Sequence, residues 1–261
     1  MSRIVSWFSC GAASAVATKI ALDSLRRDIQ AHRESPHSNE EDLVAMENRF
    51  IIATCVVENE HPDNERFLKD CENWYGKKIL RLRSKKYNDC WEVWEQTKYL
   101  VGVKGARCTT EMKKLVRQEF QSIRDTQIFG FTIEEQNRAD RFKQQNPEVN
   151  LDVPLIRKGL TKEDCFSVLK NAKIELPTMY KLGYKNNNCI GCVKGGAGYW
   201  NKIRVDFPDV FKRMSELERK LGRTILKVKG KRTYLDELDS NAGHKMKEPD
   251  IECGLWCKGD K

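Results

Sequence analysis

The first stretch of the chain that could do chemistry is a run of six small residues, Ser9, Cys10, Gly11, Ala12, Ala13 and Ser14. The run follows an apolar segment and precedes apolar residues at helical spacing, which predicts a strand, a tight loop and a helix. Small residues let backbone N–H groups approach a ligand closely, and the positive end of the helix favours an anion. We therefore expect a phosphate-binding loop with Ser9 and Ser14 as further donors. Because the pattern is short, an ordinary strand-to-helix turn is the alternative.

Two pairs of cysteines form the second candidate site. Cys189 and Cys192 are separated by two residues and followed by glycines, a spacing that suits one metal ion or one cluster. Cys253 and Cys257 form another pair near the C-terminus, and the two pairs together supply four thiolates. That is the usual number for structural zinc or an iron–sulfur cluster. Cys108 is an alternative ligand, and a redox-active or simply reduced pair of thiols is the alternative function.

The other cysteines are expected to be small buried hydrophobic residues, because they fall within predicted strands or helices: Cys55, Cys71, Cys90 and Cys165. Cys10 is expected to serve only as a small residue of the loop. Ten cysteines in 261 residues without a charged-then-apolar leader favour reduced thiols or metal ligands over disulfides. We therefore expect a cytoplasmic protein.

Expected strands alternate with expected helices through the first part of the chain. The strands are expected at 4–8, 50–57, 78–82, 127–131 and 153–156, and the helices between them at 15–25, 65–74, 89–100, 111–122 and 133–145. This alternation predicts an α/β fold with a doubly wound parallel sheet, which binds ligands at the carboxyl ends of its strands. The loops at that edge would be 9–14, 58–64, 107–110 and 131–141.

The last hundred residues have a different pattern. Helices are expected at 161–172 and 205–221, and 225–234 is expected to form a hairpin with a basic face, either solvated or in contact with a phosphate backbone. We therefore expect a nucleotide-binding α/β domain over 1–160 and a helical, cysteine-containing region over 161–261. No apolar run is long enough to cross a bilayer, so no membrane partner is expected.

The charge of the chain favours polyanionic partners. Lysine and arginine number 47 against 38 aspartate and glutamate, which gives a formal net charge of +9. A nucleotide or a nucleic acid would complement that charge, although a merely basic protein is equally consistent with it.

In their order along the chain, these motifs resemble the PAPS reductase-like family of the PP-loop (adenine nucleotide alpha-hydrolase-like) superfamily, over about 4–200 and again in the tail. The Ser9–Ser14 run resembles the PP-loop, and Glu60 opens a segment similar to the one that follows the family's second strand. The remaining matches are Arg107, Cys108 and Thr109 through Lys113, Gly130 with Glu134, Glu135 and Arg138, the region from Tyr180 to Cys192, and the tail around Cys253.

The resemblance implies an enzyme that binds an adenine nucleotide, ATP or PAPS/APS, with magnesium as a candidate companion. The implied nucleotide-binding residues are Ser9, Cys10, Gly11, Ala12, Ala13, Ser14, Glu60, Arg107, Thr109 and Gly130. Lys113 and Arg138 would stabilise charge on the phosphates, and Cys253 matches the nucleophile of thiol-dependent reductases. The cysteines would hold an iron–sulfur cluster or zinc.

Two departures from the family pattern bear on the chemistry. Ala12 and Ala13 replace the Lys-Asp of the ATP-pyrophosphatase loop, yet Ser14 keeps a hydroxyl that can bind the pyrophosphate of ATP. Cys108 is followed by Thr109 rather than by a second cysteine, so the cluster pattern of the reductases cannot be copied whole.

Three functions remain open. The first is ATP-dependent adenylation coupled to sulfur transfer, with a small molecule or a nucleic acid as substrate and a sulfur-donor protein or thiol reductant as partner. The second is thiol-dependent reduction of PAPS or APS by Cys253. The third is a non-catalytic module that binds a nucleotide or nucleic acid. Any of them could act as a homo-oligomer.

Overall fold

The computed structural model describes residues 2–102 and 105–243, and its chain forms two compact units from interleaved segments. The first, which we call the sheet unit, comprises Met1–Cys55, Pro62–Leu82 and Gln118–Asn187. The second, the cysteine unit, comprises Val56–His61, Arg83–Arg117 and Asn188–Lys261. The division expected from the sequence, at residue 160, stays a prediction.

A five-stranded parallel sheet is the framework of the sheet unit. Its strands are β1 (Ile4–Trp7), β2 (Phe50–Cys55), β3 (Ile79–Leu82), β6 (Thr126–Ile128) and β7 (Asn150–Asp152), in the spatial order β3-β2-β1-β6-β7. Every neighbouring pair is parallel. The predicted α/β fold with a parallel sheet is therefore confirmed, and it is consistent with a Rossmann-like arrangement.

The residues of β1 alternate between two covered faces. Ser6 hydrogen-bonds Thr18 of α1 (Ala12–Arg33), and Phe8 stacks on Phe67 of α3 (Asn64–Tyr75). Trp7 points the other way, where its ring meets Phe120 edge-on at 6.0 Å. This two-residue period buries apolar groups on both faces, as a sheet covered on each side requires.

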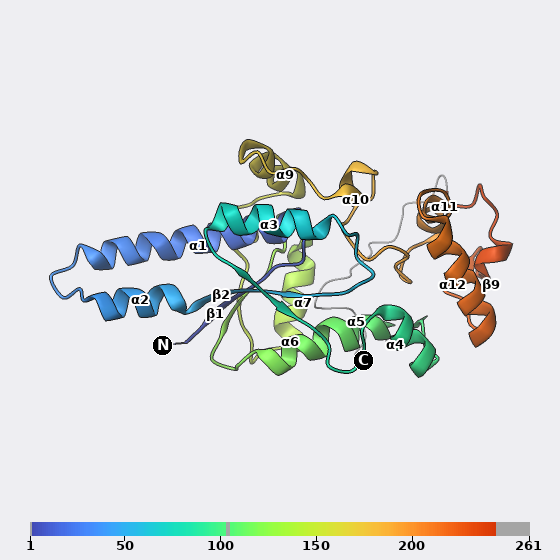
Figure 1. The fold of residues 1–261 in the computed structure, drawn as a ribbon, viewed down its shortest axis with the longest axis horizontal. Helices are drawn as coiled ribbons and strands as arrows, with labels where there is room; N and C mark the ends of the chain where they lie inside the picture. The colour runs from blue at the N-terminus through green and yellow to red at the C-terminus, as the bar shows by residue number, and fades with distance from the viewer. Residues whose placement is uncertain (1, 103–104, 244–261) are drawn as a thin grey trace. The chain divides into compact units, whose positions relative to one another are not determined.

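Helix α1 contributes buried apolar side chains to the hydrophobic core of the sheet unit. It packs beside α3 and α9 (Lys162–Asn171), and Figure 1 shows these three helices lying together. Capping explains where α9 begins, because Thr161 accepts the N–H of Asp164 while the Asp164 carboxylate accepts the N–H of Thr161. The helix predicted at 161–172 is thus confirmed.

The remaining helices of the sheet unit are short. They are α2 (Glu40–Asn48), the 3₁₀ helix Ile133–Glu135, α7 (Gln136–Gln145), α8 (Pro154–Arg157) and α10 (Thr178–Lys181). The extended piece predicted at 153–156 is wrong. Pro154 occupies the first turn of α8, a position that tolerates its missing N–H, and the strand lies just before it in polar Asn150–Asp152.

The cysteine unit is mainly helical in its described part. Its elements are α4 (Cys90–Thr97), β4 (Val101–Gly102), β5 (Gly105–Ala106), α5 (Arg107–Thr109), a π-helix (Thr110–Lys114), α11 (Ala197–Asp206), α12 (Pro208–Leu221), β8 (Leu226–Val228), β9 (Lys231–Thr233) and a 3₁₀ helix (Leu235–Glu237). α6 (Leu115–Phe120) spans the boundary of the two units. The antiparallel pair β8–β9 confirms the predicted hairpin. Among the described helices, none has the length and apolar character needed to cross a bilayer.

Candidate functional site

The strand order of the sheet reverses direction between β1 and β6. From β1 the chain builds outward to β2 and β3, and then returns to place β6 and β7 on the other side. The loops that leave the carboxyl ends of β1 and β6 lie at this reversal, which is where open parallel sheets bind ligands. The predicted phosphate loop is the β1 loop, and predicted Gly130 lies in the β6 loop.

The phosphate loop is a tight turn held by its own hydroxyls. Ser14 Oγ accepts the backbone N–H of Ser9 at 3.0 Å and donates to the carbonyl of Gly11 at 2.9 Å. Cys10 has φ of +55°, a left-handed conformation that non-glycine residues rarely adopt. The first turn of α1 contains no acidic side chain, so the positive end of that helix is left for an anion.

Gly130 is required where it is because the β6 loop presses on the start of α1. A Cβ at this position would lie 2.6 Å from the backbone nitrogen of Ser14 and 2.8 Å from the carbonyl carbon of Ala13. At such distances even the smallest side chain forces the β6 loop and the first turn of α1 apart. The structure therefore brings Gly130 together with Ser9 and Ser14, as the sequence predicts.

Asn187 supports the left-handed residue of the loop from a distant part of the chain. Its side-chain amide donates to the carbonyl of Cys10 at 2.7 Å and to Oδ1 of Asn64 at 2.8 Å. Asn187 is only 6 % exposed, and its Oδ1 has no hydrogen-bond partner among the described residues. The side chain that bonds to Cys10 of the phosphate loop thus also carries a buried acceptor without a partner among the described residues.

The hydroxyl of Tyr180 accepts a hydrogen bond from a backbone N–H of the phosphate loop, that of Ala12. Burial raises the pKa of its phenol to about 12, while the backbone N–H groups of Ala12 and Asn187 hydrogen-bond to it and act in the opposite direction. The same hydroxyl lies 3.3 Å from the position that a Cβ would take at Gly11. Two loop amides, those of Ser9 and Ala12, are thus bonded to side-chain oxygens, at least one of which a phosphate oxygen would have to replace.

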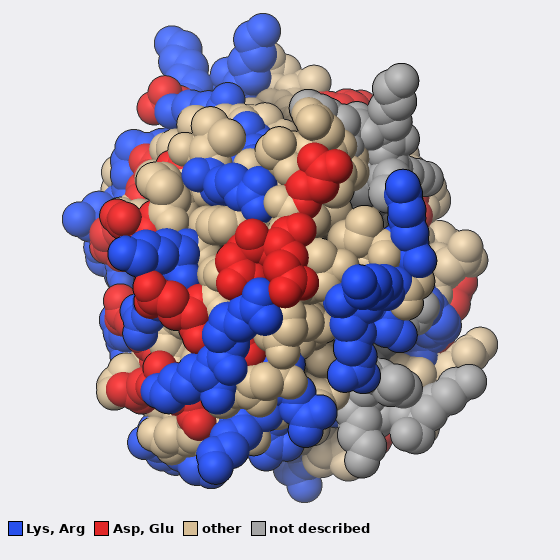
Figure 2. Space-filling view, turned by 90° about the vertical axis from the view of Figure 1, so that its right-hand side faces the viewer, with Lys and Arg blue, Asp and Glu red and all other residues tan. Residues whose placement is uncertain are grey.

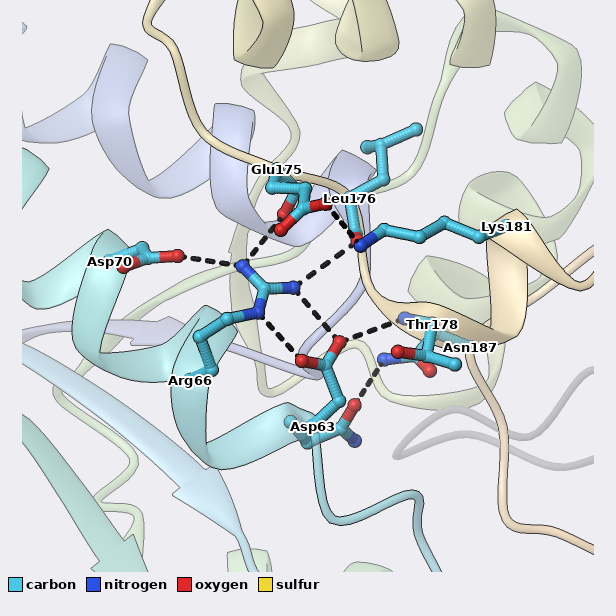
Figure 3. Close-up of polar contacts among 9 residues, drawn as sticks. Asp63, Arg66, Asp70, Glu175, Leu176, Thr178, Lys181 and Asn187 are labelled. Carbon is cyan, nitrogen blue, oxygen red and sulfur yellow. Dashed lines mark hydrogen bonds and ion pairs between the residues drawn. The ribbon is translucent and has the colours of Figure 1, made fainter.

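An ion pair fixes the segment that carries Tyr180 and Asn187. Figure 3 shows that two guanidinium nitrogens of Arg66 in α3 donate to the carboxylate oxygens of Asp63, at 2.6 and 2.9 Å. Arg66 also donates to the backbone carbonyls of Glu175 and Leu176. Asp63 Oδ2 in turn accepts the N–H of Thr178 at 2.9 Å. The arginine, followed by the Thr178 N–H, holds the pKa of Asp63 well below its usual range.

Arg138 is the cation of the β6 loop. Its guanidinium lies 5.1 Å above the ring of Phe131 and donates to Glu135 at 2.5 Å, and its Nε is buried without a partner among the described residues. Glu135 also caps the turn at Thr132. Predicted Arg138 is therefore held in place by neighbours on its own loop.

The other predicted nucleotide-site residues belong to the cysteine unit. Lys113 lies in the π-helix and pairs with Glu60 at 2.9 Å, and both side chains are largely buried. Arg107 pairs with buried Glu111 at 2.7 Å, and Thr109 is buried beside them in sequence. π-Helical turns occur frequently at functional sites, which agrees with the expected importance of this stretch.

Cys189 and Cys192 form a turn closed by one tyrosine. Gly191 between them has φ of +73°, and a Cβ there would lie 2.6 Å from Val210. The hydroxyl of Tyr199 accepts the N–H of Cys192 at 2.9 Å and donates to the carbonyl of Cys189 at 3.2 Å. Both thiols are buried.

Cys90 lies with this turn, which the sequence did not predict. Its thiol hydrogen-bonds with those of Cys108 and Cys189, and these bonds, together with burial, raise its pKa well above the ordinary value. Asn59 links the same parts, because its side-chain Oδ1 accepts the N–H of Cys90 at 2.7 Å and its backbone carbonyl accepts the N–H of Ile190 at 2.8 Å. We call Cys90, Cys108, Cys189 and Cys192 the thiol group.

The predictions for the other cysteines have mixed outcomes. Cys55, Cys71, Cys90 and Cys165 are buried, as predicted, and Cys10 of the phosphate loop is buried as well. Cys253 and Cys257 lie outside the described residues. Across 2–102 and 105–243, no group of three or more histidine, cysteine or acidic side chains is arranged to hold a metal ion.

Comparison of the chain with models of known protein families, with curated proteins and with solved structures gave no match. The family and the roles of the site residues therefore stay predictions.

Proposed function

We propose that the chain is a PAPS reductase-like enzyme that binds ATP with its phosphates on the Ser9–Ser14 loop and transfers the adenylyl group to a substrate. The observation that carries this proposal is the position of the loop. It opens at the reversal of strand order, with Gly130 of the neighbouring strand pressed on the first turn of α1. Backbone N–H groups and a helix N-terminus at such a point favour a phosphate over other ligands.

The chemistry follows from where the donors lie. A nucleophilic oxygen of the substrate attacks the α-phosphorus of ATP, a new P–O bond forms, and the bond to the pyrophosphate breaks. The loop hydroxyls and amides hold the leaving pyrophosphate, with magnesium as its candidate counter-ion, and Arg138 supplies positive charge from the β6 loop. A phosphate oxygen takes the place of the Tyr180 hydroxyl on the Ala12 amide. The role of Lys113 on the phosphates stays a prediction.

A nucleic acid is the substrate that the charges of the cysteine unit favour. Between Lys220 and Leu235 the chain has six basic residues and no acidic one. Five of them are exposed and form no ion pair within the described chain: Arg223, Lys227, Lys229, Lys231 and Arg232. Figure 2 shows one face of the molecule, on which many Lys and Arg side chains lie among several groups of acidic side chains. Phosphate backbones bind to such surfaces with strong salt dependence.

Exchange of labelled pyrophosphate into ATP tests the reaction. We expect exchange to depend on an added substrate, with RNA and DNA tried first. Ser14→Ala should abolish the exchange. Ser167→Ala is the control and should keep it, because the Ser167 hydroxyl bonds only to a carbonyl of its own helix, α9. No exchange with any nucleic acid or small acceptor would refute adenylation.

Reduction of PAPS or APS is the second candidate. The thiol group favours it, because it contains four thiols without Cys253 and Cys257, and Cys253 is then not required as a ligand. Cys253 would attack the sulfur, the S–O bond to the nucleotide would break, and the resulting cysteine thiosulfonate would release sulfite when an external thiol forms a disulfide with Cys253. A trapped sulfonate on Cys253 would support it. Binding of ATP without exchange or adduct would indicate the non-catalytic module.

A further inference from the structure

The hairpin β8–β9 has one apolar face and one basic face. Its register places Lys227 directly opposite Arg232 and Leu226 opposite Thr233. Side chains alternate along each strand, so Lys227 and Arg232 share one face and Leu226 lies on the other. Leu226 is buried, whereas both cations are exposed. Like charges directly opposite each other destabilise a strand pair, and a bound anion removes that cost.

The tip of the hairpin breaks a local rule in the same direction. Lys229 has φ of +50° and Gly230 has φ of +80°, the left-handed pair that a two-residue turn of type I′ requires. Asparagine, aspartate or glycine usually fills the first of these positions, and lysine is disfavoured there. The Lys229 side chain is exposed, so packing does not compensate for its conformation. A residue held in this way, without a structural gain, indicates a functional role.

Glu218 of α12 fixes the base of the hairpin. Its buried carboxylate accepts the N–H of Ile225, just before β8, at 2.6 Å and the N–H of Leu235, after β9, at 2.7 Å. Both ends of the hairpin are therefore bonded to one helix. A ligand that binds to a hairpin ordered in advance loses less free energy to ordering.

The acidic residues that follow the hairpin are engaged by another cation. Asp236 accepts two hydrogen bonds from Arg219, each at 2.8 Å, and Glu237 accepts one at 2.7 Å. The same guanidinium lies 3.8 Å above the ring of Tyr234. Four hairpin cations consequently form no ion pair with any residue that the structure describes: Lys227, Lys229, Lys231 and Arg232.

The form of the hairpin selects among polyanions. Single-stranded nucleic acids bind to exposed aromatic rings as well as to cations, and neither β8, β9 nor the turn between them contains an aromatic residue. A two-stranded ribbon fits the major groove of B-form DNA, which is about 12 Å wide, and the major groove of A-form RNA is too narrow for side chains. These features favour duplex DNA.

We propose that the hairpin β8–β9 binds duplex DNA in the major groove, with Lys227 and Arg232 on the phosphates of the two groove walls and Lys229 on the backbone at the tip. The inference rests on the proposed function in one respect, because it narrows the nucleic-acid substrate to duplex DNA. Contacts to phosphates carry no sequence information, so the affinity should depend on salt and not on base sequence.

Binding of a labelled DNA duplex of random sequence to the full chain, without ATP, tests this surface. Four phosphate contacts predict a slope of roughly −3.6 for log K against log salt concentration. Lys227→Ala/Arg232→Ala should weaken binding about tenfold or more and reduce the slope to roughly −1.8. The control Lys158→Ala/Lys170→Ala removes the same charge from exposed positions of the sheet unit and should bind as the wild type does.

Lys229→Asn separates binding from folding. Asparagine suits the left-handed position at the tip, so the melting temperature should not fall. The slope should still become smaller by roughly 0.9, because one phosphate contact is lost. An unchanged slope in this variant would contradict the contact at the tip.

Three results would overturn the proposal as a whole. They are no binding of duplex DNA at low salt, equal binding by the wild type and Lys227→Ala/Arg232→Ala, and binding of single-stranded DNA, double-stranded RNA or anionic lipid vesicles as tight as that of duplex DNA. Failure of adenylation is distinguishable. Duplex binding with the expected slopes but no pyrophosphate exchange would refute adenylation alone, and exchange without duplex binding would refute this surface alone.

Discussion

Replacing Gly130 by alanine should weaken ATP binding at the phosphate loop as well as the fold. The added Cβ would lie 2.6 Å from the nitrogen and 2.7 Å from the Cα of Ser14, and both are backbone atoms of α1. Ordinary contact begins near 3.4 Å, so the β6 loop and the first turn of α1 must separate by several tenths of an ångström. Overpacking of this kind costs about 1–3 kcal/mol of unfolding free energy.

The affinity for ATP should also fall. The loop donors move with the helix, and several hydrogen bonds to the phosphates weaken together, so we expect at least a tenfold loss, or about 1.4 kcal/mol. Urea unfolding gives the stability and titration calorimetry the affinity for ATP.

Gly159→Ala is the matched control for this experiment. Gly159 lies in the same unit with φ of +66°, and nothing lies within 4 Å of its Cβ position. Alanine there carries only backbone strain, about 1–2 kcal/mol, and should leave ATP binding intact. A folded Gly130→Ala protein that binds ATP as tightly as the wild type would refute the role given to this contact.

Three further changes have defined outcomes. Asp63→Asn should cost about 1–3 kcal/mol at pH 7, because the lowered pKa of Asp63 stabilises the fold above about pH 4 and that stability is lost as the pH falls below this value. As the pH falls below about 4, the free energy of unfolding measured with urea should therefore decrease more steeply in the wild type than in Asp63→Asn. Burial raises the pKa of Glu218 to about 7, so its protonated form stabilises the fold below about pH 4.5 and that contribution disappears as the pH rises through 7. Glu218→Gln should flatten the change of melting temperature over that range, and an unchanged slope would contradict the assignment. Tyr180→Phe frees the Ala12 amide and should strengthen ATP binding up to about tenfold, measured by calorimetry, and weaker binding would show that the hydroxyl helps to hold the nucleotide.

The sheet and the phosphate loop could be predicted because local patterns encode them. Apolar segments separated by helical periodicity indicate parallel strands, and the position of the Ser9–Ser14 loop at the carboxyl edge follows from that topology. Reliance on local apolar patterns also explains why the edge strand β7 was not predicted. Asn150–Asp152 is polar, since an edge strand is covered less than a central one, while apolar Leu155 and Ile156 form a helical turn behind Pro154.

The contacts of Cys90, Tyr180 and Asn187 could not be predicted, because each depends on which distant segments meet. Cys90 precedes Trp91, Val93 and Trp94, which resemble an ordinary buried helix face. Nothing near it in the sequence indicates that its thiol meets Cys189. Charge and spacing alone likewise do not place the Tyr180 hydroxyl on the loop amides.

The most direct test of the central claim is an NMR titration of the amide-labelled full chain with ATP. If the phosphates bind where β1 passes into α1, the amide signals of Gly11 to Ser14 and of Gly130 should shift most, and the shifts should saturate. Competition by inorganic pyrophosphate should reverse them. Saturable shifts elsewhere that leave these amides unchanged, or no shift with ATP, PAPS or APS, would contradict the account.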